Sequence, residues 1–383
     1  MERRMQHPYW IWDSMERTPA MLEACLKEPI SSAVERVAAR LSDLGVRRVF
    51  CTGTGSSGYA SMVHACAFRE LAGLQASWHV SSELSAYPPP DMATGAALVL
   101  ASHSGRTLGD LRLVELARRK GAYTVGITDI AESPLAQAVD ETIIGPGGPK
   151  PELPATRTYV AAMFRVLQLA AAVGRQSQSS GVARGFEEQL RSLPETMRVF
   201  FGSFATQASQ WVAALSGVQR YFTIAAGPNM STACEGALIL LQSTDAGAQA
   251  FHVEEMLHGP IQALREDMCV IVVAAPGPLQ QRILQSAEAS ALIGATAVIL
   301  APEDLTIPGA VMRIAMPAGI AELLTPLLYI VPLWLIGYES ALATGRDPDN
   351  LSRDRPEFKQ AFRLLMAGDP RFTAQTARTD RGC

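Results

Sequence analysis

The sequence predicts an α/β fold with two parallel β-sheets, each flanked by helices. Short apolar runs that suit buried parallel strands alternate with segments of helical periodicity. The same alternation returns in the second half of the chain at a steady offset. Of the 383 residues, 48% are hydrophobic and 18% are charged, a balance typical of a compact protein with a large core. This length suits two ordinary domains.

The first half begins with an amphipathic arm at 7–30, which is followed by a helix over 35–44. From there strands and helices alternate. The predicted strands cover 47–51, 76–80, 97–101 and 123–128. The predicted helices cover 59–71, a segment that starts at 108, and 156–173. Strands that alternate with helices in this way form a parallel sheet covered on both faces.

The second half repeats this pattern. Arg220-Tyr221-Phe222 follows Arg48-Val49-Phe50 by 172 residues, and the strand at 270–274 follows 98–102 by the same number. A steady offset over several elements indicates that one domain was duplicated. We expect an arm at 1–30, a first domain at 31–175, a linker at 176–195, a second domain at 196–345 and a tail at 346–383.

Charge and cysteine content exclude several classes of partner. The net charge is −4 with both signs interspersed, so we expect no nucleic-acid or membrane partner. The six cysteines form no metal-binding spacing, which favours reduced core cysteines, a cytoplasmic protein and no metal or cofactor. The most apolar stretch, 323–338, contains Pro326 and Pro332, and we predict a buried helix there rather than a membrane span.

A hydroxyl-rich turn, SHSGRT at 102–107, joins the strand at 97–101 to the next helix. Such a turn brings backbone N–H groups and the positive end of a helix dipole together, so it suits a phosphate ester without a metal. The alternative interpretation is that the hydroxyls only cap the helix. A second turn, GTGSSG at 53–58, lacks the spacing of a dinucleotide site. AAPGPL at 274–279 replaces the hydroxyl turn in the second half, which predicts one phosphate site per chain.

Several motifs in this order resemble the double-SIS (sugar isomerase) family, which includes the isomerase half of glucosamine-6-phosphate synthase and fructosamine-6-phosphate deglycases. The turn at 102–107 matches S-x-S-G-x-T, and Gly55-Ser56-Ser57 and Ser82-Glu83 match two further positions. Residues 234–238 match L-E-G-A-L, and 255–260 match E-L-K-H-G-P. The resemblance implies two tandem SIS domains, each a flavodoxin-like three-layer sandwich.

The resemblance also implies roles for individual residues. The implied phosphate ligands are Ser57, Ser102, His103, Ser104 and Thr107. The histidine of H-G-P is His258, which would open the sugar ring from the neighbouring subunit. The resemblance therefore implies a homodimer with a shared active site and a sugar phosphate as ligand.

This sequence departs from the family where proton transfer takes place. Gln242 replaces the glutamate that carries a proton between C1 and C2, and an amide cannot act as a base. Glu235, seven residues earlier on the same helix face, and Glu255, just before His258, are the possible replacements. The C-terminal family lysine has only a partial counterpart in Arg353, and the nearest actual lysine is Lys359.

Two functions remain open from the sequence. The first is an enzyme that acts at C1–C2 of a sugar phosphate or amino-sugar phosphate by isomerisation, deamination or cleavage of a fructosamine. The second is a non-catalytic sugar-phosphate sensor or binding protein, which Gln242 favours. No cysteine-dependent glutaminase segment precedes the domains, so we expect no glutamine-fed amination. A purely structural dimer is disfavoured by the intact turn at 102–107.

Overall fold

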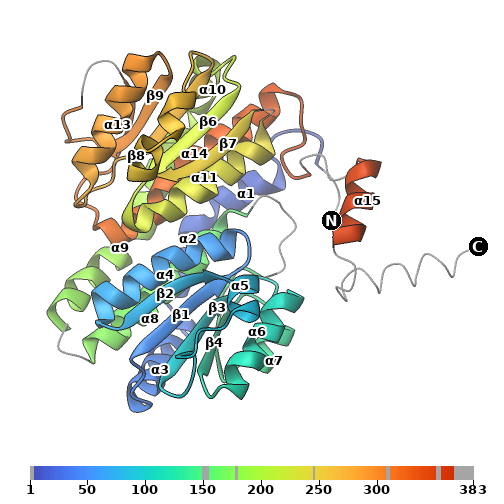
Figure 1. Cartoon of the computed structure of the whole chain (residues 1–383), viewed down its shortest axis with the longest axis vertical. Helices are drawn as coiled ribbons and strands as arrows, with labels where there is room; N and C mark the ends of the chain where they lie inside the picture. The colour runs from blue at the N-terminus through green and yellow to red at the C-terminus, as the bar shows by residue number, and fades with distance from the viewer. Residues whose placement is uncertain are drawn as a thin grey trace, which may run out of the picture.

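The computed structural model describes residues 4–148, 155–176, 180–244, 246–307, 311–350 and 355–365. Two α/β halves lie one above the other in Figure 1. Helix α4 (Ser56–Ala72) of the first half faces α11 (Met230–Ser243) of the second half at their interface.

The first half is a three-layer sandwich around five parallel strands in the order β2-β1-β3-β4-β5. The strands are β1 (Arg48–Gly53), β2 (Gln75–Val80), β3 (Ala96–Ala101), β4 (Tyr123–Thr128) and β5 (Glu141–Ile144). Helices α3 (Ile30–Asp43), α4 and α8 (Arg157–Arg175) cover one face. Helices α5 (Ser81–Ala86), α6 (Leu108–Arg119) and α7 (Pro134–Ala138) cover the other. All six residues of β3 are buried, as its apolar run predicts.

The second half has the same architecture. Its strands are β6 (Arg220–Ala225), β7 (Gly247–His252), β8 (Met268–Val273), β9 (Thr296–Pro302) and β10 (Met312–Met316), in the order β10-β9-β8-β6-β7. Its helices are α10 (Ala208–Ala214), η1 (Gly227–Asn229), α11, α12 (Val253–Leu257), η2 (Pro260–Ala263), α13 (Gln280–Ile293), η3 (Glu322–Leu324) and α14 (Thr325–Ala343). Numbered within each half, both sheets have the flavodoxin-like order 2-1-3-4-5.

The N-terminal arm is not a free appendage. Helices α1 (Trp10–Glu16) and α2 (Thr18–Cys25) pack on the body, and the Trp12 ring lies 5.2 Å from that of Tyr338 on α14. The apolar side chains Ile11, Met15 and Leu22 of the arm are buried within the chain itself. The stretch 323–338 falls mostly within α14 and is buried, as the sequence predicts.

Helix α14 is a core helix of the second half, where it packs against α10 and α11 and also contacts α8 of the first half. The stretch Glu322–Ala343 is long and apolar enough to cross a membrane by length and composition, but 83% of its most apolar window is buried inside the protein. The segment predicted as a linker at 176–195 falls mostly within a long helix, α9 (Ser180–Ala205), so the connection between the halves is largely helical. A short helix, α15 (Pro356–Leu365), follows α14 and has no buried residue.

Candidate functional site

The two glycine- and serine-containing turns follow neighbouring strands, β1 and β3. From β1 the chain crosses to β2 on one side and then to β3 on the other, and this reversal is the place where open α/β sheets bind ligands. Gly53 allows the close approach, because a Cβ there would lie 2.8 Å from the carbonyl oxygen of Ala101 and 2.7 Å from the carbonyl carbon of Ser57. The turns at 53–58 and 102–107 therefore open at the same edge of the sheet.

The turn at 102–107 has a conformation that requires glycine. Gly105 has a φ of +59°, and a Cβ on it would lie 2.4 Å from Oγ of Ser133. Thr107 stands at the N-cap of α6, but its hydroxyl makes no capping bond to the helix backbone. The Ser104 hydroxyl accepts a 3.4 Å hydrogen bond from the Arg106 N–H within the turn. The capping interpretation thus fails at Thr107, where it applies most directly.

A buried carboxylate forms hydrogen bonds with hydroxyls of both turns. Asp110 on α6 is only 2% exposed, and its Oδ1 accepts a 3.0 Å hydrogen bond from Thr54 of the first turn. Burial raises the pKa of Asp110, while hydroxyls from both turns and from Ser81 favour its charged form. Ser102 and Thr107 are among these hydroxyls. Asp110 therefore holds the two turns together.

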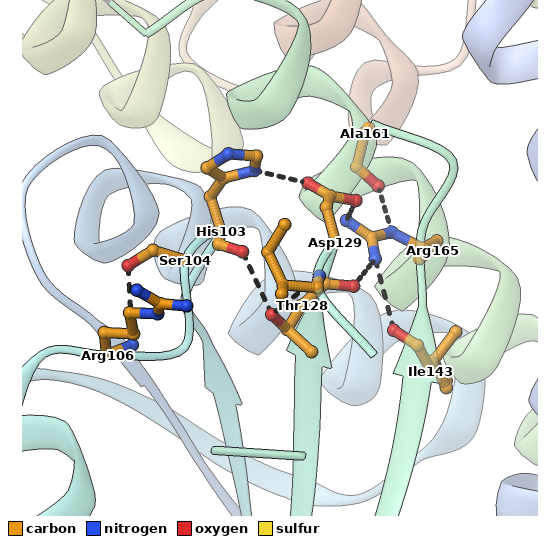
Figure 2. A network of polar contacts seen from close by, with 9 residues as sticks. His103, Ser104, Arg106, Thr128, Asp129, Ile143, Ala161 and Arg165 are labelled. Carbon is orange, nitrogen blue, oxygen red and sulfur yellow. Dashed lines mark hydrogen bonds and ion pairs between the residues drawn. The ribbon is translucent and has the colours of Figure 1, made fainter. Parts of the chain in front are cut away.

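A second polar network fixes His103 (Figure 2). Its Nδ1 lies 2.8 Å from Oδ2 of Asp129, the residue that follows β4. Oδ1 of the same carboxylate forms a 2.9 Å ion pair with Arg165 on α8, and both of these side chains are only 1% exposed. Arg165 also donates to the carbonyl oxygens of Thr128, Ile143 and Ala161.

The charge of Asp129 depends on these neighbours. Burial by itself would raise its pKa, but the Arg165 guanidinium and the hydrogen bond from His103 outweigh burial and lower the pKa below the ordinary value. Asp129 is therefore a carboxylate under ordinary conditions. As an ion it can only accept hydrogen bonds, so Nδ1 of His103 carries the hydrogen.

Comparison with known proteins identifies similar sequences and folds. Residues 45–172 match the family model of the SIS domain. The first half of the chain is therefore similar to a SIS domain. The chain is also 27% identical to glutamine–fructose-6-phosphate aminotransferase [isomerizing] of Gloeobacter violaceus, over 89% of this chain and 57% of that protein. It spans about half the length of the curated relatives that it matches.

Two solved structures share the fold over nearly the whole chain. The C-terminal domain of glucosamine-fructose-6-phosphate aminotransferase from Francisella tularensis superposes with a TM-score of 0.79 at 16% identity, covering 90% of this chain and 98% of that one. Tagatose-6-phosphate ketose/aldose isomerase from Escherichia coli superposes with a TM-score of 0.78 at 18% identity, covering 92% and 97%. At this identity the likeness shows the fold.

Among its described residues, the second half has no counterpart of the polar site in the first half. Its turn at 274–279 carries no hydroxyl, and the Glu322 carboxylate occupies the space beside Gly277, where a Cβ would lie 2.3 Å from Oε1. Burial raises the pKa of Glu322, and the nearby charge of Glu70 adds to the effect. An acidic side chain in this position disfavours a bound anion.

The predicted proton-transfer residues are dispersed. Glu235 is fully buried on α11, where its charge affects the buried Tyr159 of α8. Gln242, on the same helix, is half-buried, and its Oε1 is buried without a hydrogen-bond partner. Glu255 and His258 are both exposed at α12, whereas Glu254 pairs with Arg282 at 2.8 Å.

The remaining candidates lie near the C-terminus. Lys359 is on the exposed helix α15, and Arg353 lies outside the described residues.

Ser57, a candidate in the first half of the chain, is half-buried in the first turn of α4, beside the hydroxyl turn. Among the residues that the structure describes, no three His, Cys, Asp or Glu side chains are grouped so that they could hold a metal.

Three site residues escaped the sequence analysis: Asp110, Asp129 and Arg165. The sequence does point to Asp129, because this residue follows the predicted strand at 123–128 in the same way that the hydroxyl turn follows the strand at 97–101. Arg165 had another, because it is a lone charge within an apolar helix. Cavity volume does not identify this site either. A cavity of about 640 Å³ lies away from the two turns, between α9, α10 and β10.

We predict that Asp129→Asn lowers the free energy of unfolding by about 3–5 kcal/mol, because it leaves the buried Arg165 guanidinium without its counter-charge. Urea unfolding at pH 7 measures the loss. The matched control is Glu115→Gln, which removes an exposed ion pair with Arg119 and should cost about 0.5 kcal/mol or less. Equal losses in the two variants would contradict the prediction.

The same ion pair predicts how stability depends on acid. Because the pKa of Asp129 is lower in the folded state, its stabilising contribution is present above the ordinary aspartate pKa of about 4 and is lost as the pH falls through the folded value. The difference in the free energy of unfolding between wild type and Asp129→Asn should therefore shrink as the pH is lowered from 5 to 2, as measured by urea unfolding at each pH.

Proposed function

We propose that this chain binds the phosphoryl group of a sugar phosphate or amino-sugar phosphate at its two turns and acts at C1–C2 of that ligand. The observation that carries the proposal is the turn at 102–107, whose hydroxyls stand at the switch point of a SIS domain without capping the helix that follows. The proposed phosphate ligands are Ser57, Ser102, His103, Ser104 and Thr107.

The names of similar proteins support the proposed reaction class. They include an isomerizing aminotransferase of fructose 6-phosphate and, among the structures that share the fold, a tagatose-6-phosphate ketose/aldose isomerase. Isomerisation, deamination and fructosamine cleavage all require a ring opener and a proton carrier near C1–C2. We propose His258 as the ring opener, with a proton carrier other than Gln242. A cytoplasmic location goes with this proposal.

A second function, sugar-phosphate binding without catalysis, is favoured by one observation. The position of the family base holds a neutral amide, and the nearest carboxylate on the same face, Glu235, is fully buried between the halves. A buried group must become accessible before it can take a proton from a sugar carbon. Product analysis for every sugar phosphate that raises the thermal unfolding midpoint separates the two functions, because ligand binding alone produces the shift.

We predict that Ser104→Ala weakens binding of sugar phosphates by about 1.5–3 kcal/mol, because one hydrogen bond to a charged group is lost. Binding of the corresponding unphosphorylated sugars should not change. Calorimetric titration of fructose 6-phosphate and fructose measures both. Ser192→Ala, on the exposed surface of α9, is the control and should bind like wild type. If wild type bound the two sugars equally, the phosphate site would be refuted.

We predict that Gln242→Glu increases aldose–ketose isomerisation, because loss of a general base typically costs about 10²–10⁴-fold in rate and this variant restores one. Conversion of glucose 6-phosphate to fructose 6-phosphate is the measurement. Gln249→Glu, at an exposed position of β7, controls for added charge. Rapid wild-type turnover that survives both Glu235→Gln and Glu255→Gln would contradict the missing-base interpretation.

We also propose a homodimer in which His258 serves the turns of the partner subunit. The exposed position of His258 after α12 supports this, since the side chain is accessible to a second copy. Sedimentation equilibrium at the assay concentration should give twice the mass of 41.1 kDa. A stable monomer with full activity would refute the shared site.

A further inference from the structure

We propose that His103 holds the phosphoryl group as an imidazolium, so that binding of a phosphate dianion takes up one proton on Nε2. This inference rests on the proposed phosphate site and adds a proton-linked step to it.

The ring is oriented by contacts on two sides. The His103 carbonyl oxygen accepts hydrogen bonds from the Thr128 hydroxyl at 3.0 Å and from the Asp129 N–H at 3.2 Å. These bonds fix the backbone of the turn against the end of β4. On the other side Nδ1 lies 2.8 Å from Asp129 Oδ2. Figure 2 shows the ring directed toward that carboxylate, with Nδ1 as the nearer nitrogen.

This arrangement determines what Nε2 can do. With the hydrogen on Nδ1, a neutral ring presents a lone pair at Nε2 and is an acceptor there. A phosphate dianion also has only acceptors. The two therefore repel each other until Nε2 gains a proton, after which the ring donates to the phosphate oxygen.

The proton cannot come from Asp129. Its carboxylate is held charged by Arg165 at 2.9 Å, and both groups are 1% exposed. The proton must come from solvent. In this proposal the protonated ring lies between two anions, Asp129 at Nδ1 and the phosphoryl group at Nε2, and both favour the imidazolium.

The other charged groups around the turn cannot take up the proton in place of His103. Arg106, exposed on the turn, lies near Ser104 in Figure 2 and is a permanent cation for the same ligand. Asp110 faces the turn from α6 beneath it, and Glu132 is exposed in the loop after β4. Neither carboxylate can donate to a dianion while it is charged. We therefore assign the added proton to His103.

The test is calorimetric titration of fructose 6-phosphate at pH 8 in two phosphate-free buffers of different ionisation enthalpy. A phosphate ester is a dianion at this pH, because its second pKa is about 6, and an ordinary imidazole is neutral. We expect the observed enthalpies to differ by an amount that corresponds to uptake of about one proton per site. Affinity should fall by up to about tenfold per pH unit between pH 8 and 9.

His103→Gln is the decisive variant, because its amide donates a hydrogen bond without titrating. It should bind fructose 6-phosphate with no proton uptake and with an affinity that does not change over this pH range. His7→Gln, in the exposed part of the N-terminal arm, is the matched control and should keep the wild-type uptake. His103→Asn, also an amide, takes its place if His103→Gln does not fold.

Three outcomes count against the inference. Wild-type binding with no proton uptake overturns it, and this comparison needs no variant. Proton uptake that persists in the folded amide variants assigns the proton to another group and also overturns it. If neither fructose 6-phosphate nor inorganic phosphate binds at any pH, the proposed phosphate site itself is wrong, and the inference falls with it.

Discussion

The ion pair between Arg165 and Asp129 is the interaction on which the geometry of the site depends. Arg165 reaches from α8 to the carbonyl oxygens at the ends of β4 and β5, so one side chain joins three elements at the carboxyl edge of the sheet. A buried pair of this kind adds little net stability compared with apolar packing, but it is costly to break. Its effect is to give Asp129 a fixed charge and His103 a fixed orientation.

Comparison of the two halves shows which of these polar residues the fold requires. Counted from matching elements, the positions of His103, Asp129 and Arg165 correspond in the second half to Ala275, Pro302 and Leu333, which are all buried or apolar. The second half nevertheless forms the same five-stranded sheet with the same strand order. The fold therefore does not require the polar network. Within the part of the chain that the structure describes, the network lies beside the hydroxyl turn and has no equivalent at the matching positions of the second half.

Most of the fold could be predicted from the sequence, since strands buried on both faces are continuous apolar runs. The predicted strand at 123–128 is β4 to the residue, and 97–101 is β3 without Ala96. The partners of charged groups were not predictable in the same way. Arg165 and Asp129 are far apart along the chain, and only the packing of α8 against the sheet brings them together. The packing of the N-terminal arm on Tyr338 could not be predicted for the same reason, because this contact joins opposite ends of the chain.

The residues proposed for the two ends of a sugar phosphate differ in how firmly the structure holds them. At the phosphoryl end, glycine conformations, Asp110 and the ion pair determine the position of each group before any ligand arrives, and preorganised groups bind with little loss of freedom. At the sugar end, the described residues supply a neutral amide at Gln242 and an exposed histidine after α12. In the proposed function, affinity for the phosphoryl group therefore depends on the first half of the chain. Catalysis would depend on what the second half, or a second copy, adds to it.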